Sequence, residues 1–181
     1  MNTVLIIGAS GQGKTFFAKE KFVYPNKPCF VFDINNEYFE DRRNTDPKTM
    51  LVTNPKLEAD TTKPRSRYIG GDMDEFIDIA ETKRNCNIIF DEATIFFNGR
   101  ITEKKLLKMI LTRKHSFNNI ILNFHSVEDT PRFMYRQSNY IVLFKTQDSE
   151  KAFSTKSEFL KPYWIKISKM PDHSKIIIPR L

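Results

Sequence analysis

GASGQGKT, at residues 8–15, is the most informative stretch of this chain for its fold, and it directly follows the apolar run VLII. The apolar run predicts a strand, and TFFAKEKF, which overlaps the end of the stretch, is compatible with a helix. This order of strand, glycine-rich loop and helix is the context that the phosphate-binding pattern GxxxxGK[ST] requires. The stretch therefore predicts a nucleotide-binding loop. A glycine-rich turn ahead of an ordinary helix is the alternative.

Each residue type in this loop has a physical role. Glycines let the backbone turn its N–H groups toward phosphate oxygens, and the helix that follows points the positive end of its dipole at them. Lys14 would contact the β- and γ-phosphates of ATP, and the Thr15 hydroxyl would bind Mg²⁺. The predicted nucleotide-binding residues are Gly8, Ala9, Ser10, Gly11, Gln12, Gly13, Lys14 and Thr15.

NIIFDEA, at residues 87–93, predicts the second half of the site, because an apolar strand ends there in two acids. In phosphate-loop enzymes an aspartate at this point orients Mg²⁺, which assigns Asp91 as a metal-binding residue. The neighbouring carboxylate, Glu92, can accept a proton from the water that attacks the γ-phosphate. Phosphoryl transfer to a small acceptor needs no activated water, so Glu92 favours hydrolysis. A strand that ends in a solvated acidic turn is the alternative.

A third strand, at residues 119–124, brings two further polar side chains to the predicted site. Asn123 and His125 are two residues apart and therefore lie on the same face while the chain stays extended. They could sense the γ-phosphate or hold the attacking water. A polar turn without a function in catalysis remains the alternative.

The length and the composition predict one soluble domain. The chain has 181 residues, of which 40% are hydrophobic, and no apolar stretch approaches the roughly 20 residues that span a bilayer. Two distant cysteines favour buried thiols in a reducing compartment. The formal net charge of +7 indicates either a polyanionic partner or a solvated basic surface.

Apolar strands alternate with helix-like stretches, which predicts a mostly parallel central sheet with helices on both faces. The predicted domain comprises a core (1–150), an irregular basic insertion (40–68) and a C-terminal extension (151–181). Within the extension, PYWIKIS and HSKIIIPRL predict a β-hairpin or a pair of edge strands. The predicted strands are 3–7, 29–33, 86–91, 119–124 and 140–145, and the predicted helices are 14–23, 73–83, 103–115 and 131–137.

Three segments beyond the phosphate loop resemble the FtsK/HerA branch of the P-loop ATPases, and within it the small genome-packaging ATPases of tailless viruses and the Zot-like phage assembly ATPases. FVFDINNEY is similar to the family's second strand, which ends in an aspartate followed four residues later by Glu-Tyr. IIFDEATIFF is similar to its acidic strand, and TRKHSFNNIILNFHS to its basic turn and sensor strand. These segments are residues 30–38, 88–97 and 112–126.

The resemblance implies a RecA-like (ASCE) fold, with the phosphate-loop strand between the sensor strand and the last strand. It also implies homo-oligomeric rings, hexamers or pentamers, that move double-stranded DNA through a central pore. An arginine of the basic turn would reach the γ-phosphate of a neighbouring subunit, which assigns Arg113. The alternatives for that role are Arg100, Arg132 and Arg136, and Arg113 as a plain surface residue is a further alternative. The sequence departs from the family at His125, where glutamine is usual.

The leading hypothesis is therefore an ATP- and Mg²⁺-dependent double-stranded DNA translocase, a subunit of a viral genome-packaging motor. Zot-like proteins carry a membrane anchor and this sequence shows none, which favours the packaging subgroup. The expected partners are double-stranded DNA, further copies of the chain and capsid vertex proteins, in the host cytoplasm or the virion. The proposed DNA-contacting residues are Lys63, Arg65, Arg67, Lys104, Lys105 and Lys108.

Two other functions fit parts of the sequence. A small nucleoside or nucleotide kinase shares the phosphate loop and the chain length, but KPRSR at residues 63–67 precedes the acidic strand and makes a poor kinase lid. A nucleic-acid-binding module that uses ATP only as a structural ligand would not need Glu92.

Overall fold

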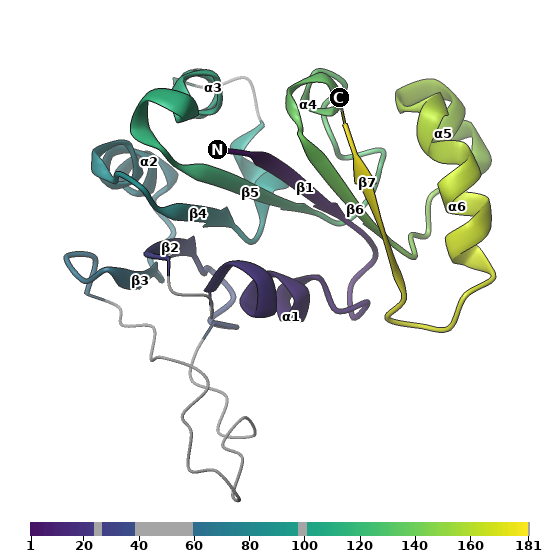
Figure 1. Ribbon diagram of the computed structural model, residues 1–181, viewed down its shortest axis with the longest axis horizontal. Coiled ribbons are helices and arrows are strands. Elements are labelled where there is room, and N and C mark those ends of the chain that lie inside the picture. The colour runs from purple at the N-terminus through teal and green to yellow at the C-terminus, as the bar shows by residue number, and fades with distance from the viewer. Residues whose placement is uncertain (24–26, 39–59, 98–100, 181) are drawn as a thin grey trace, which may run out of the picture.

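The protein, as a computed structural model, is described over residues 1–23, 27–38, 60–97 and 101–180. Its centre is a seven-stranded sheet with the order β3-β2-β4-β5-β1-β6-β7 (Figure 1). β7 is antiparallel to β6, and all the other neighbouring strands are parallel. The strands are β1 (Thr3–Ile7), β2 (Cys29–Phe32), β3 (Arg65–Tyr68), β4 (Asn87–Phe90), β5 (Asn119–Phe124), β6 (Tyr140–Phe144) and β7 (Lys175–Pro179).

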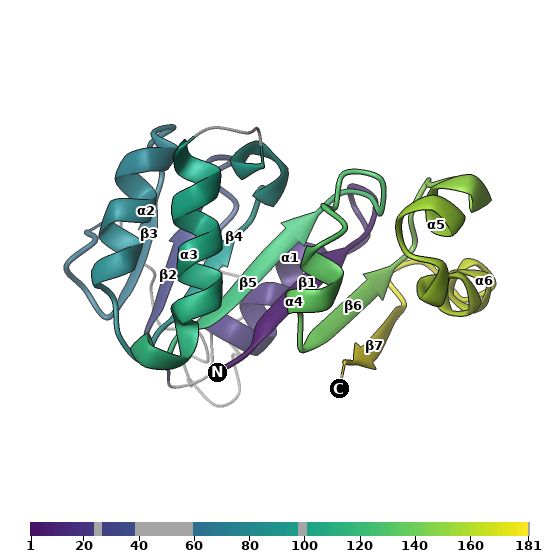
Figure 2. The ribbon, with the colours of Figure 1, turned by 90° about the horizontal axis from the view of Figure 1, so that it is seen from above.

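Helices cover both faces of this sheet, as the sequence predicts. Figure 2 shows α2, α3 and α4 in front of the sheet and α1 behind it. The α-helices are α1 (Lys14–Ala18), α2 (Met73–Thr82), α3 (Ile101–Ser116), α4 (Met134–Gln137), α5 (Glu150–Lys156) and α6 (Lys161–Ser168). A π-helical turn, η1 (Lys19–Val23), continues α1, and two 3₁₀ turns are η3 (Ala93–Phe96) and η4 (Glu158–Leu160).

The two faces of the sheet bury separate apolar clusters, because successive side chains of a strand point to opposite faces. In β1, Leu5 and Ile7 belong to the cluster beneath α2 and α3, whereas Val4 and Ile6 belong to the cluster beneath α1. All five residues of β1 are buried. A strand buried on both faces reads as a continuous apolar run, which is why VLII is such a clear signal.

The strand order places the phosphate loop in the middle of the sheet. β1 lies between β5 and β6, the sensor strand and the last strand of the predicted core. β4, which leads to the two acids, is the other neighbour of β5. The carboxyl ends of β1, β4 and β5 therefore meet at one edge, where ligands bind in open α/β sheets.

The C-terminal extension corrects one prediction. Only HSKIIIPRL contributes a strand, β7, whereas PYWIKIS forms helix α6. Pro162 lies in the first turn of α6, where its fixed φ is compatible with a helix. Ile167 is buried in the large apolar cluster that also contains Leu5 and Ile7, and Trp164, three residues earlier, packs against the same cluster. This helical spacing outweighs the β propensity of the individual residues.

The insertion at 40–68 is not irregular throughout. Its last residues form β3, which extends the sheet beyond β2 with four parallel register pairs, Cys29–Arg65 to Phe32–Tyr68. Residues 39–59 lie outside the described part of the chain. The polar sequence RSRY hides this strand because β3 is at the edge of the sheet and only Ser66 is fully buried.

Candidate functional site

The phosphate loop connects β1 to α1 and lies between the ends of β5 and β6. The Gly8 N–H donates to the Phe124 carbonyl at 3.1 Å, and the Ala9 N–H donates to the Lys145 carbonyl at 2.8 Å. A Cβ at Gly8 would lie 2.5 Å from Cβ of Phe144, so no larger residue fits there. Gly13 begins the helix with φ +93°, a left-handed conformation that favours glycine. The glycine spacing thus follows from packing at one position and backbone conformation at another.

Lys14 is the buried cation of the loop. Its Nζ donates to the Ala9 carbonyl at 3.0 Å and lies 3.4 Å from Nδ1 of His125. Burial lowers the pKa of Lys14, and the nearby carboxylates of Asp91 and Glu92 oppose that effect. The ammonium group therefore lies between the loop and the two acids, where the β- and γ-phosphates of a bound nucleotide would be expected.

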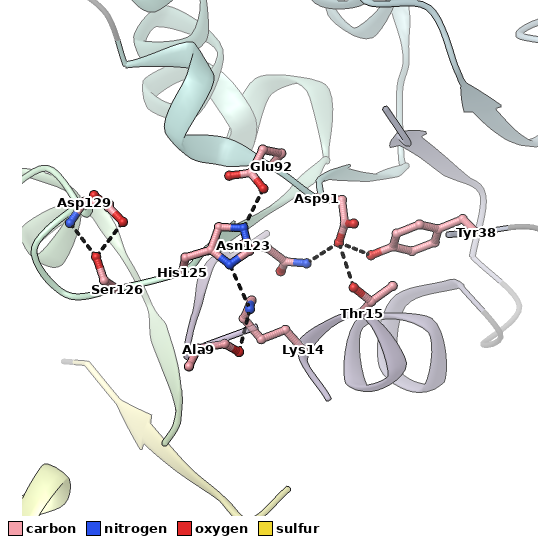
Figure 3. Close-up of polar contacts among 10 residues, drawn as sticks. All are labelled: Ala9, Lys14, Thr15, Tyr38, Asp91, Glu92, Asn123, His125, Ser126 and Asp129. Carbon is pink, nitrogen blue, oxygen red and sulfur yellow. Dashed lines mark hydrogen bonds and ion pairs between the residues drawn. The ribbon is translucent and has the colours of Figure 1, made fainter. Parts of the chain in front are cut away.

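Three hydroxyl or amide donors converge on one oxygen of Asp91 (Figure 3). Its Oδ1 accepts from Thr15 Oγ1 at 3.3 Å, from the Tyr38 hydroxyl at 2.9 Å and from Asn123 Nδ2 at 2.6 Å. Burial raises the pKa of Asp91 to about 6, although the hydrogen bonds from Tyr38 and Asn123 lower it. None of these three donors contacts the second carboxylate oxygen, Oδ2, which could therefore bind a metal ion. The Thr15 hydroxyl and this second carboxylate oxygen are hard oxygen ligands of the kind that Mg²⁺ prefers.

Tyr38 is a site residue that the sequence reasoning left without a role. Burial raises its pKa well above the ordinary value, so the phenol stays protonated and donates to Asp91. The loop that carries it is fixed by Asp33, whose carboxylate accepts from the backbone N–H groups of Glu37 and Tyr38 at 2.7 and 3.1 Å. The signal was present in FVFDINNEY, where the aspartate and the Glu-Tyr pair are four residues apart.

Glu92 and His125 form the second branch of the site. His125 Nε2 lies 2.6 Å from Glu92 Oε2, while Nδ1 of the same ring faces Lys14 (Figure 3). If Nδ1 accepts from the Lys14 ammonium, the neutral ring carries its proton on Nε2 and donates it to Glu92. His125 therefore links the lysine of the loop to the acid that follows β4.

Five of these side chains line one cavity of about 380 Å³: Lys14, Thr15, Asp91, Glu92 and His125. Glu92 is only partly buried, with 18% of its side chain exposed, so its carboxylate remains accessible to water in this cavity. The lining residues are Ser10, Gly11, Gly13, Lys14, Thr15, Phe16, Asn35, Glu37, Asp91, Glu92 and His125. A cation, a metal-ligand pair and an accessible carboxylate in one cavity are the groups that phosphoryl chemistry needs.

Asn123 lies at the site, beside Asp91. It is 1% exposed, its Nδ2 donates to Asp91, and its Oδ1 has no hydrogen-bond partner among the described residues. A contact of Asn123 with the γ-phosphate or the attacking water stays a prediction. Its contribution in the structure is to position the Asp91 carboxylate.

Arg113 lies away from these residues. It is on the buried face of α3 and is 8% exposed. Its guanidinium donates to the Ile110 carbonyl at 2.6 Å and to Asn139 Oδ1 at 3.2 Å, beside the start of β6. A guanidinium that reaches a neighbouring subunit has to be exposed, so this placement argues against the trans role. Arg100 lies outside the described residues.

Ion pairs within the chain engage three of the proposed DNA-contacting side chains. Arg67 forms an ion pair with buried Asp33 at 3.0 Å, which fixes the loop that carries Tyr38. Lys105 pairs with Asp78 of α2, and Lys108 lies 4.0 Å from Glu81 of the same helix. The lysines of α3 are therefore not a uniformly free basic face. Lys104 remains exposed on that helix.

Within the described ranges, no helix is long and apolar enough to cross a membrane. The same residues contain no group of three or more His, Cys, Asp or Glu side chains placed to hold a metal ion. The Thr15 and Asp91 pair is thus a partial ligand set, to which substrate phosphates and waters would add the remaining oxygens, as is usual for Mg²⁺.

Neither a known protein family nor a curated protein sequence matches the chain. Solved structures do match. The genome-packaging NTPase B204 of Sulfolobus turreted icosahedral virus 2, in complex with ATPγS, is 17% identical, with a TM-score of 0.70 and coverage of 98% of this chain and 91% of that one. Its sulfate complex gives a TM-score of 0.72 at 15% identity, covering 98% and 90%.

A second virus has a similar protein. The DNA-packaging ATPase B204 of Sulfolobus turreted icosahedral virus is 16% identical, with a TM-score of 0.66 and coverage of 99% and 98%. At such identities the likeness concerns the fold, and it extends over nearly the whole of each chain. The resemblance to viral packaging ATPases predicted from the sequence is thus confirmed at the level of structure: this chain has the α/β fold of a P-loop NTPase and is similar throughout its length to the packaging NTPase B204.

Proposed function

We propose that the chain is an ATPase that hydrolyses the terminal phosphate of ATP at the phosphate loop. The observation that carries this proposal is the position of Glu92. Its carboxylate lines the same cavity as Lys14 and accepts a hydrogen bond from His125. A protein that only held the nucleotide, or passed its phosphate to an acceptor, would have no use for a base that can activate water there.

In the proposed reaction a water attacks the γ-phosphorus and Glu92 accepts a proton from it. The bond between the γ-phosphorus and the β–γ bridging oxygen breaks, which yields ADP and inorganic phosphate. Lys14 would exchange the Ala9 carbonyl and the His125 ring for phosphate oxygens and stabilise their charge. Thr15 and Asp91 would hold Mg²⁺, whose charge offsets that of the β- and γ-phosphates.

We further infer that hydrolysis moves double-stranded DNA and that the chain is a subunit of a viral genome-packaging motor. The end-to-end similarity to proteins described as genome-packaging NTPases supports this role. The net charge of +7 is consistent with a nucleic-acid partner. The proposal includes a homo-oligomeric ring of five or six copies, contact with capsid vertex proteins, and a location in the host cytoplasm or the virion.

The test is an ATPase assay at low salt with duplex DNA, single-stranded DNA or a panel of nucleoside monophosphates. A translocase should turn over ATP faster when duplexes of unrelated sequence are present, because backbone contacts carry little sequence information. The Glu92→Gln variant is the control, since its folded site should bind ATP without turnover.

A kinase would behave differently in the same assay. It would convert an added monophosphate into a diphosphate, with turnover indifferent to DNA. That result would replace the translocase proposal. Turnover without DNA stimulation and without a phosphorylated product would leave an ATPase and remove the translocase role.

A further inference from the structure

A second cavity, of about 530 Å³, lies apart from the phosphate loop, between the α4 region, the turn from α5 to η4 and the end of β7. The Arg180 N–H donates to the Asn139 carbonyl, and the Asn139 N–H donates to the Thr3 carbonyl, both at 2.8 Å. Arg180 is thus beside the amino ends of β6 and β1, whereas Gly8 follows the carboxyl end of β1. The two cavities are at opposite edges of the sheet, and Figure 1 shows α4 and the C-terminal end of β7 on the side away from α1.

The charge of this second cavity is strongly positive. Its described lining includes one acid, Glu158, and the cations Arg132, Arg136, Lys156 and Arg180. None of the four cations forms an ion pair with a carboxylate in the described parts of the chain. Four cations against one acid leave an excess of positive charge in this cavity, so an anion bound there would be stabilised.

Two of the arginines are held in place before any ligand binds. Arg132 donates from Nη2 to the Thr155 carbonyl, and the Arg180 guanidinium lies 3.8 Å from the centre of the Phe159 ring. The Arg136 guanidinium is exposed and has no hydrogen bond to another described residue. Such a planar, multi-donor group binds the oxygens of a phosphate in pairs.

Ser157 provides an independent indication of a polar ligand. It lines the cavity and is 6% exposed, and its Oγ has no hydrogen-bond partner among the described residues. Buried hydroxyls are normally hydrogen-bonded, because leaving one unpaired costs free energy. A bound oxyanion or its water would satisfy this group.

We propose that this cavity is a phosphate-binding site distinct from the nucleotide site, formed by Arg132, Arg136, Arg180 and Ser157. The ligand is a phosphate group, supplied either as a free phosphate or as a phosphodiester of a nucleic-acid backbone. The site does not depend on the proposed ATPase activity, since it shares no residue with the cavity of the phosphate loop.

The experiment measures binding by calorimetry with two probes, inorganic phosphate and a short DNA duplex. The full-length chain is saturated with a non-hydrolysable ATP analogue, so that the phosphate loop is occupied. Arg136→Gln should weaken binding about tenfold, the loss expected for one charge-assisted hydrogen bond. Arg84→Gln, the same change at another exposed arginine outside this cavity, should leave binding unchanged.

Ser157→Ala separates a ligand-binding role from a structural one. The hydroxyl has no partner among the described residues, so its loss should leave the unfolding midpoint unchanged or slightly higher, while phosphate binding weakens several-fold.

Binding of both probes, or of the duplex alone, supports the site, and the second result identifies the phosphodiester as the ligand. Absence of binding for both probes, or equal binding by the Arg136→Gln and Arg84→Gln variants, would overturn the proposal. Because binding and not turnover is measured, either result leaves the ATPase proposal untouched.

Discussion

At the residue scale, Asp91 is the group on which most of the nucleotide cavity depends. Its donors come from three segments: the start of α1, the loop after β2 and strand β5. All three reach the same oxygen, which fixes the carboxylate and leaves the other oxygen for a metal ion or its waters. Tyr38 and Asn123 therefore act through Asp91, as positioning residues.

Lys14 and Glu92 should separate binding from chemistry. Lys14→Ala should abolish turnover and weaken nucleotide binding, because the phosphates lose their buried cation. Glu92→Gln should bind ATP normally but lose about 10²- to 10⁴-fold in kcat, the usual contribution of a general base. Steady-state turnover and binding of a fluorescent ATP analogue, measured in parallel, distinguish the two. Undiminished kcat in Glu92→Gln would remove the proposed base.

His125 should act by holding Glu92. Glutamine can both donate and accept through one side chain, so His125→Gln should keep most of the activity. His125→Ala releases the carboxylate, and a loss of up to about a hundredfold in kcat is expected from the misplaced base. The comparison of kcat with KM checks this, because KM should change little in both variants. Equal kcat in His125→Ala and the wild type would mean that the contact has no role in turnover.

Asp91 should make stability depend on pH. Its pKa is about 6 in the folded protein and has an ordinary value of 3.8, so between these values the folded state holds a proton that the unfolded chain releases. The bound proton therefore stabilises the folded state. This stabilisation is complete below the ordinary pKa of 3.8 and is lost as the pH rises through 6. In metal-free protein, Asp91→Asn should gain about 2 to 3 kcal/mol over the wild type above pH 6.

Urea unfolding of both proteins from pH 4 to 8 measures that difference. It should shrink toward the acid end, where Asp91 is protonated in both states. A difference that does not vary with pH would show that burial has not shifted this carboxyl group. Since a metal ion favours the ionised form, Mg²⁺ binding should weaken as the pH falls through 6.

At the element scale, α3 differs from the helix face that the sequence suggests. The spacing of the apolar residues in this helix predicts a buried stripe through Leu106, Leu107, Ile110 and Leu111. In the structure Leu106 and Ile110 are buried, but Leu111 is 62% exposed. Met109 and Arg113 complete the buried face instead. The spacing of 106, 109 or 110, and 113 is helical, so Arg113 lies where an apolar residue is normally expected.

Arg113 should therefore contribute to stability and not to the chemistry of a neighbouring subunit. Arg113→Ala removes the hydrogen bonds to Ile110 and Asn139, and a loss of about 1 to 3 kcal/mol in the free energy of unfolding is expected. Urea unfolding measures that loss. Mixing Arg113→Ala chains with Glu92→Gln chains tests the other interpretation. Activity restored by mixing would show that the arginine does act in trans.

At the scale of the whole molecule, the fold brings two cavities to opposite edges of one sheet. The nucleotide cavity is at the carboxyl ends of β1, β4 and β5, and the basic cavity is beside the amino ends of β1 and β6. The C-terminal extension contributes to the basic cavity through η4 and Arg180. The extension therefore lines a cavity in addition to pairing with β6 at the edge of the sheet.

The excess of basic residues predicts how DNA should bind. If lysines and arginines contact backbone phosphates, the logarithm of the duplex affinity should fall linearly with the logarithm of the salt concentration, with a slope of about 0.9 per phosphate contacted. The duplex concentration that half-maximally stimulates ATPase activity, measured at several salt concentrations, gives this slope. ATPase activity without DNA serves as the control, since it should respond much less. Stimulation that is independent of salt would contradict backbone binding.

The fold class and most of the nucleotide cavity follow from local sequence patterns. GASGQGKT after VLII, and the two acids after NIIF, are patterns whose chemistry depends on neighbours in the chain. Parallel strands bring their carboxyl ends together, so the sequence is enough to predict that Lys14, Asp91 and His125 lie near one another.

How those groups are connected, and what lies elsewhere in the molecule, depends on tertiary packing. The hydrogen bond from Tyr38 to Asp91 joins residues 53 positions apart, and the ion pair of Arg67 with Asp33 depends on β3 pairing with β2. No local pattern specifies such pairs, since they arise from strand order. For the same reason the sequence showed neither the burial of Arg113 nor the convergence of Arg132, Arg136 and Arg180 on one cavity. Local patterns specify elements, whereas side chains distant in sequence become neighbours only when those elements pack.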